Sequence, residues 1–121
     1  MQFALLIYET ADDFTRRRGP DAAAYWSSWA AYSGALKAHT TGGACLKSPE
    51  TGVVLSQTQS GRQVQDGPYA ETKEQLGGVI LFEADTLDEA LAWAERCPAA
   101  QHGAVEVRPV QPMSEIAEMQ S

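Results

Sequence analysis

Two stretches of the chain are apolar on both faces of an extended strand. One covers residues 3–8 and the other covers residues 78–84. In the first stretch the two alternating sets are Phe3, Leu5, Ile7 and Ala4, Leu6, Tyr8. Side chains of a strand alternate between the two faces of a sheet, so a run that is apolar on both faces is typical of a strand covered on both sides. The pattern therefore predicts two central strands.

A first helix is predicted to begin at Gly19-Pro20-Asp21, because proline is favoured in the first turn of a helix, where its missing N–H has no partner. The apolar residues that follow have helical spacing, which places them on one core-facing stripe. They are Tyr25, Trp29, Tyr32 and Leu36. The opposite face is uncharged and small, and consists of Ala23, Ser27, Ala31, Gly34 and Ala38. Such a face is either covered by another element or an alanine-rich surface in solvent.

A second helix is predicted to begin at Thr86. Thr86 and Glu89 have the spacing of a capping box, in which each side chain caps a backbone N–H group at the helix start. Pro98 ends the helix, because the residue before a proline avoids helical geometry. The buried face is predicted to consist of Leu87, Ala90, Leu91 and Ala94.

The segments around the first helix are predicted to be irregular. Residues 9–19 contain Asp12, Asp13 and three consecutive arginines, and such charged stretches are typical of exposed loops. The three arginines could bind an anionic ligand, but a solvated turn is the preferred interpretation. Residues 40–43 end in two glycines, which favour the left-handed conformation that closes a helix. We therefore expect a loop before the first helix and a helix end at residues 40–43.

The remaining strands are shorter and more polar. Residues 53–58 alternate, and Ser60-Gly61 is typical of a hairpin turn into residues 62–65. Residues 105–110 alternate between valines and charged residues, which predicts a last strand with one exposed face. From residue 111 the chain is expected to form a tail with a short helix capped by Ser114.

The element order predicts an α+β fold of the ferredoxin-like kind, with an antiparallel sheet and two helices on one face. We expect one domain over residues 1–110 and a tail over residues 111–121. This layout covers only one face of the sheet, although two strands are apolar on both faces. A second copy packed sheet against sheet would cover the other face, so we predict a homodimer.

The composition excludes several classes of function. The chain has 121 residues, with Asp+Glu 16 against Lys+Arg 9 and a formal net charge of -7. Nucleic acid and anionic membranes would be repelled, so neither is expected as a partner. Cys45 and Cys97 are far apart, which favours a reduced cytoplasmic protein with free thiols over a single disulfide. Neither cysteine has metal-ligand spacing with His39 or His102, and we expect no metal and no cofactor.

One segment has the character of a motif. Residues 66–78 read Asp-Gly-Pro-Tyr-Ala-Glu-Thr-Lys-Glu-Gln-Leu-Gly-Gly. This segment resembles the signature of the DGPF proteins within the YCII-related family, with Tyr69 where that motif has phenylalanine. The similarity extends to the opening Leu-Leu-Ile-Tyr, to Gly42-Gly43, to Asp88-Glu89-Ala90-Leu91 and to residues 105–110. The resemblance implies a dimeric α+β barrel, in a group whose members mostly have no established activity.

The motif carries most of the candidate site residues. Asp66 is a candidate proton-transfer group, although an aspartate in a turn more often accepts backbone hydrogen bonds that hold the loop. Glu71 and Lys73 are candidates for binding a substrate, or they form a surface ion pair. Tyr69 is a further binding candidate, or a packing residue.

Some enzymes of the wider YCII-related family are thought to use a histidine and an aspartate for acid–base chemistry. This chain has Trp26, Ser27 and Ser28 where the resemblance would place that histidine. His39 is a candidate substitute, because histidine titrates near neutral pH, although a histidine at a helix end also caps the last carbonyls. His102 has no predicted role.

These residues lead to two hypotheses. The first is a small-molecule site at or near the dimer interface, with acid–base lyase or hydrolase chemistry on an organic compound. The second is a non-catalytic protein that senses a ligand or regulates transcription. It follows from the resemblance, because DGPF relatives are often found beside extracytoplasmic-function sigma factors.

Overall fold

The computed structural model describes residues 1–121. Its elements are β1 (Gln2–Thr10), α1 (Ala11–Arg16), α2 (Ala22–Leu36), β2 (Thr40–Cys45), η1 (Pro49–Thr51), β3 (Val53–Thr58), β4 (Gly61–Asp66), β5 (Glu74–Glu83), α3 (Leu87–Glu95), η2 (Pro98–Gln101), β6 (Ala104–Pro109) and α4 (Met113–Gln120). Four strands form one sheet in the order β2-β5-β1-β6, and every neighbouring pair is antiparallel.

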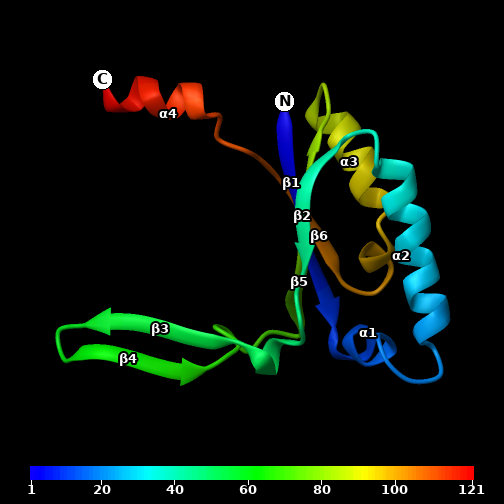
Figure 1. Cartoon of the computed structure of the whole chain (residues 1–121), viewed down its shortest axis with the longest axis horizontal. Coiled ribbons are helices and arrows are strands. Elements are labelled where there is room, and N and C mark those ends of the chain that lie inside the picture. Colours follow the sequence, from blue (N-terminus) through cyan, green and yellow to red (C-terminus); the bar gives the residue numbers. More distant parts are fainter.

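Both long helices, α2 and α3, lie on the same face of this sheet (Figure 1). β1 and β5 are the two central strands, as their apolar runs predicted. The ferredoxin-like α+β fold class is therefore confirmed. None of the helices is both long and apolar enough to cross a bilayer.

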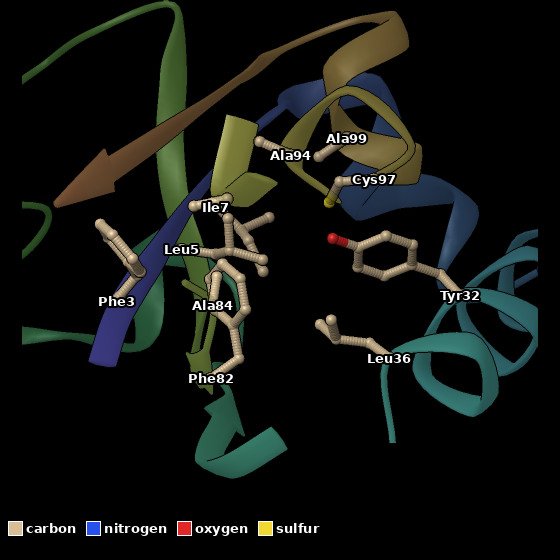
Figure 2. Packing of buried hydrophobic residues seen from close by; sticks show 11 residues of the cluster. Phe3, Leu5, Ile7, Tyr32, Leu36, Phe82, Ala84, Ala94, Cys97 and Ala99 are labelled. Carbon is tan, nitrogen blue, oxygen red and sulfur yellow. The ribbon is translucent and has the colours of Figure 1, made fainter. Parts of the chain in front are cut away.

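The core lies between the helices and the sheet. Tyr32 and Leu36 reach from α2 toward Leu5, Ile7 and Phe82 of the central strands (Figure 2). The Tyr32 hydroxyl donates to the backbone oxygen of Trp93 at 2.8 Å, so its polar atom is satisfied inside the core. Cys97, between α3 and η2, also belongs to the core, and burial raises the pKa of its thiol to about 11.

The outer face of α2 is exposed. Its small residues Ala23, Ser27, Ala31 and Gly34, and Ala38 just after the helix end, contribute nothing to the core. The core-facing side chains of α2 are more deeply buried at the C-terminal end of the helix than at its N-terminal end. Tyr32 and Leu36 are buried, whereas Tyr25 and Trp29 are half-buried beside a cavity.

The loop predicted over residues 9–19 is wrong. β1 continues to Thr10, and residues 11–16 form the short helix α1. Thr10 is its N-cap, and the threonine hydroxyl accepts from the backbone N–H of Asp13 at 3.1 Å. Asp12 and Asp13 follow in the first turn, where carboxylates favour a helix start. The acidic residues taken as loop signals are therefore helix-start signals.

The helix end predicted at residues 40–43 is also wrong. α2 ends at Leu36, and residues 40–45 form the edge strand β2 along β5. Gly43 has φ +154, and a Cβ there would lie 2.6 Å from the backbone oxygen of Val79. The glycine lets the two strands approach closely, rather than closing the helix.

α3 begins at the predicted place. Thr86 is the N-cap and accepts from the backbone N–H of Glu89 at 3.1 Å. The Glu89 carboxylate accepts from the backbone of Asp85, one residue before the cap. Only half of the predicted buried face is buried, because Ala90 and Ala94 face the core. The other half of that prediction is wrong, since Leu87 and Leu91 are 50% and 48% exposed.

The hairpin is confirmed, and its strands pair from Val53 with Asp66 to Thr58 with Gly61. It projects from the sheet on the side opposite α2 and α3 (Figure 1). One of its faces carries Val53, Leu55 and Val64, each more than half exposed. The predicted turn at the hairpin base contains a cis peptide before Pro68. Glycine at position 67 is required there because a Cβ would lie 3.0 Å from the backbone of Gly52.

The second face of the sheet has no helix over it in this chain (Figure 1). Ala4, Leu6 and Tyr8 of β1 are half-buried on that face, next to Val79 and Leu81 of β5. The prediction that both faces of the sheet are covered is therefore met within the chain on one face only.

At the chain end, α4 starts after Pro112, so the prediction of Ser114 as its cap is wrong.

Candidate functional site

The structure separates the residues that the sequence predicted as a site. Asp66 ends β4 with an exposed side chain that makes no hydrogen bond within the chain, so the expectation that it holds the loop by accepting backbone hydrogen bonds is wrong. Tyr69 is 89% exposed at the hairpin base. Glu71 and Lys73 are exposed and line the same open hollow, whereas Tyr69 lines a different one.

His39 lies far from the motif, just after α2. Its backbone N–H donates to the Leu36 oxygen at 2.9 Å, so the main chain and not the ring closes the helix. The imidazole packs against Trp93, with the ring centroids 5.6 Å apart. The structure therefore does not bring His39 together with Asp66.

A cavity of about 580 Å³ lies between α2 and the sheet, and we refer to it as the α2 cavity. Trp26 and Trp29 of α2 form part of its wall. Its strand side is formed largely by glycines and small residues, including Gly42, Gly43, Ala44, Gly77 and Gly78. Ala30 and Ser33 of the helix also line it. Small residues on both sides leave space that side chains would otherwise fill, which is why a cavity forms between these elements.

One end of the α2 cavity is polar. Glu9, at the end of β1, is 1% exposed and still lines the cavity. One of its carboxylate oxygens accepts from the Arg17 guanidinium at 2.7 Å, and the other accepts from the Tyr25 hydroxyl. This buried cluster of three polar side chains is the strongest candidate for a chemical site in the chain.

Arg17 is held from several sides. Its guanidinium donates to the backbone oxygens of Leu46 and Gly77, the latter at 3.1 Å, and lies 4.6 Å from the centroid of the Phe14 ring. Trp26 in turn donates to the backbone oxygen of Arg17 at 2.9 Å. A side chain fixed by so many partners keeps its charge in one place, so the cluster is preorganised.

Burial and pairing shift the protonation of the cluster. Burial lowers the pKa of Arg17, but the hydrogen bonds to Glu9 and Tyr25 outweigh it and the net shift is upward. Burial raises the pKa of Tyr25, and the neighbouring Glu9 carboxylate raises it further. Tyr25 therefore remains a neutral hydrogen-bond donor and Arg17 a fixed cation across the physiological pH range.

A second set of polar side chains lies next to the buried cluster of Glu9, Arg17 and Tyr25. Asp13 is 4% exposed, and its carboxylate accepts from Arg16 at 2.5 Å and contacts the Nδ1 atom of His102 at 3.2 Å. His102 thus has a partner that lies 89 positions away in the chain. This pair lines a hollow of about 340 Å³ that shares Glu9 and Tyr25 with the α2 cavity.

Sequence reasoning missed Glu9, Arg17, Tyr25, Asp13 and His102 as site residues. The signal for Glu9 was present, because it continues the buried alternation of Phe3, Leu5 and Ile7. A carboxylate on the buried side of a strand must have partners in the fold. The arginines from 16 to 18 contained those partners but were assigned to a solvated loop.

The fold and the cavity define a class of protein: a ferredoxin-like α+β domain with a partly apolar pocket under its first long helix. A family model for the YCII-related domain matches residues 1–114. The chain therefore belongs to the YCII-related domain family.

Two known proteins are similar to parts or all of the chain. An uncharacterized protein of Rhizobium meliloti (strain 1021) is 51% identical over 49 residues, which cover 39% of this chain and 40% of that protein. A solved structure of 5-chloro-2-hydroxyhydroquinone dehydrochlorinase (TftG) from Burkholderia phenoliruptrix AC1100, in complex with 2,5-dihydroxybenzoquinone, matches with a TM-score of 0.55. The match covers 92% of this chain and 94% of that chain at 18% identity, so it supports the fold.

Proposed function

We propose that the protein binds a small, flat organic molecule in the α2 cavity and acts on it by acid–base chemistry, with Glu9 as the proton acceptor. The observation that carries the proposal is the position of Glu9, a carboxylate 1% exposed that lines a cavity of about 580 Å³. Trp26 and Trp29 provide aromatic faces on which a flat ring packs.

The similar solved structure supports a lyase reaction. It is named as a dehydrochlorinase and holds a dihydroxybenzoquinone. Such an elimination starts from the keto tautomer of the hydroquinone, in which the carbon that carries the leaving group has gained a proton and is saturated. A carboxylate takes a proton from a ring carbon or hydroxyl group conjugated with that carbon, the electron pair left behind forms a new double bond, and the leaving group departs as an anion. In this chain Glu9 takes the proton, and the Tyr25 hydroxyl and the Arg17 guanidinium hold the carboxylate in place.

The motif residues and His39 remain proposed contributors outside the α2 cavity. Asp66, Tyr69, Glu71 and Lys73 lie in the exposed segment at the end of β4 and after it. Replacing Asp66 by asparagine and measuring ligand binding, with the melting temperature as a check of the fold, tests a role of Asp66 in the site. We also propose that the protein works in the cytoplasm, where Cys45 and Cys97 stay reduced.

Glu9→Gln is expected to abolish turnover, and circular dichroism checks that the variant remains folded, because Arg17 loses its buried anion. The amide keeps an oxygen that accepts from Arg17 or Tyr25, but it cannot take up a proton near neutral pH. Binding of 2,5-dihydroxybenzoquinone is the first readout, followed by release of the leaving group from halogenated hydroquinones. We expect turnover to fall by about 10²-fold or more.

The matched control is Glu95→Gln, which removes an exposed carboxylate from the end of α3. It should leave turnover and ligand binding unchanged. Equal activity of Glu9→Gln and the natural protein would refute the acid–base role. Ligand binding without any turnover in the natural protein would instead favour the non-catalytic alternative.

We also propose a homodimer that packs the uncovered sheet faces together. Its support is the half-buried apolar face of β1 and β5, together with the exposed Leu55 and Val64 of the projecting hairpin. A two-stranded hairpin is marginal alone and gains stability when its apolar face is covered. The hairpin and the uncovered face lie on the same side of the molecule (Figure 1), so one second copy could cover both.

Leu81→Lys is expected to convert the dimer into a monomer. The lysine would place a charge on the uncovered face of the sheet, opposite Ala4 of β1 and Gly42 of β2, where a buried and unpaired ammonium is strongly unfavourable. Light scattering at micromolar concentration measures the mass, and circular dichroism checks that the monomer is folded. Ala31→Lys on the exposed outer face of α2 is the control and should remain dimeric. A monomeric natural protein would contradict the proposal directly.

A further inference from the structure

We infer that the ligand carries an anionic substituent, a carboxylate or a phosphate ester, which binds in a second hollow next to the α2 cavity. We refer to this hollow, of about 1120 Å³, as the motif hollow. It lies between the turn after α1, the η1 segment and the motif residues 67–75. The inference rests on the proposed function and names the chemical class of the molecule that the same site takes.

The charge of the motif hollow differs from that of the chain. Four basic residues line it, Arg17, Arg18, Lys47 and Lys73, against two acidic ones, Glu50 and Glu71. Over the whole chain the proportion is reversed, with Lys+Arg 9 and Asp+Glu 16. Nearly half of all basic residues thus line one hollow, although the protein as a whole repels anions.

Three of these cations are not used by the fold. Arg17 is paired with Glu9, but Arg18, Lys47 and Lys73 form no ion pair within the chain. With Arg17 neutralised by Glu9, these three cations face the two carboxylates of Glu50 and Glu71, which also form no ion pair, so the hollow keeps a net positive charge. Their position around a single hollow is explained by an anionic group that binds between them.

The motif hollow and the α2 cavity share a wall. Arg17 and Trp26 line both of them. Trp26 is 42% exposed, and its ring lies on the boundary between the apolar cavity and the basic hollow. A molecule with its ring under α2 and an anionic substituent extending past Trp26 would occupy both. This arrangement also gives Lys73 of the motif a role in binding, through the substituent rather than the ring.

Three aromatic probes test the inference: 1-naphthol, 1-naphthoate and 1-naphthyl phosphate. Binding is measured by the change in tryptophan fluorescence and by calorimetry, at low and at high salt. We expect the two anions to bind about tenfold or more tightly than the neutral naphthol at low ionic strength, and this preference to shrink at high salt. The order of naphthoate and naphthyl phosphate identifies which anion the hollow prefers.

A triple variant, Arg18→Gln with Lys47→Gln and Lys73→Gln, should remove the preference for anions without changing the binding of naphthol. The control exchanges the same positions with retention of charge, as Arg18→Lys, Lys47→Arg and Lys73→Arg, and should keep the preference. Arg62→Gln on the hairpin is a second control and should also keep it. Melting curves verify that all variants are folded.

The outcomes separate the two proposals. Equal binding of naphthol and its anionic relatives, unaffected by the triple variant, would overturn the anionic substituent and leave the proposed function in place. Failure of all three probes and of 2,5-dihydroxybenzoquinone to bind the natural protein would overturn both. A preference for anions that survives in the triple variant would place the anion elsewhere and refute the motif hollow as its site.

Discussion

Arg17→Met is expected to lower the free energy of unfolding by about 3 kcal/mol or more, because it leaves the Glu9 carboxylate buried without its cation. The side chains of Glu9 and Arg17 are 2% and 11% exposed, and no other cation contacts the carboxylate. The backbone oxygens of Leu46 and Gly77 also lose a charged donor. Chemical denaturation, monitored by circular dichroism and tryptophan fluorescence, measures the loss.

A double-mutant cycle identifies the cause. In Arg17→Met combined with Glu9→Gln, the buried charge is gone and the amide oxygen still accepts from Tyr25, so about 2 kcal/mol should be recovered relative to Arg17→Met alone. Arg62→Met on the exposed hairpin is the control, with an expected change within about 0.5 kcal/mol. If the two substitutions at the cluster were simply additive, Glu9 and Arg17 would not be coupled, and the cluster would not be the structural unit described above.

The sheet and the long helices were predictable because their signals are local. Strand alternation in residues 3–8, helical spacing between Tyr25 and Leu36, and the Thr86 cap each act within one element. The ferredoxin-like order followed from the sequence of these elements. The fold predictions were wrong where one residue type is compatible with two different local structures. The acidic residues 12 and 13 start a helix as readily as they mark a loop, and the glycines 42 and 43 permit a close strand approach as readily as a helix end.

The candidate site was less predictable, because its contacts join distant parts of the chain. Arg17 reaches Gly77 across 60 positions, and Asp13 reaches His102 across 89. No spacing rule relates such residues. The resemblance of residues 66–78 to a family signature placed the predicted site at the hairpin base, whereas the buried carboxylate, Glu9, is on β1. The alternation of β1 did contain the missing information, because Glu9 falls on the same face as Ile7.

The second half of the motif connects the predicted family signature with the buried cluster of Glu9, Arg17 and Tyr25. Gly77 belongs to the segment that resembles the family signature, and it also contacts the buried cluster through its backbone oxygen. The pairing of β1 with β5 slips at this point, since Ile7 is opposite Gly78 and Tyr8 is opposite Leu76. Gly77 is therefore the extra residue of a β-bulge, which re-aims the strand beside the site.

Gly77→Ala is expected to destabilise the protein by about 2 kcal/mol and to weaken ligand binding. The added Cβ would lie 2.6 Å from the Glu9 carboxylate, 3.0 Å from the Arg17 guanidinium and 3.1 Å from the Phe14 ring. These atoms end flexible side chains, but hydrogen bonds hold the Glu9 and Arg17 atoms in place, so a shift that admits the methyl group breaks the cluster. Thermal denaturation and titration with 2,5-dihydroxybenzoquinone measure the two effects.

Gly34→Ala is the matched control for this substitution. Gly34 lies inside α2 on its exposed face, and a Cβ there would meet no atom within 4 Å. Alanine is favoured over glycine within a helix, so this variant should gain about 0.5–1 kcal/mol and bind the ligand unchanged. Full stability and full binding in Gly77→Ala would mean that Glu9 and Arg17 rearrange freely around the methyl group. The preorganised carboxylate on which the proposed chemistry depends would then be absent, even though the cavity remained.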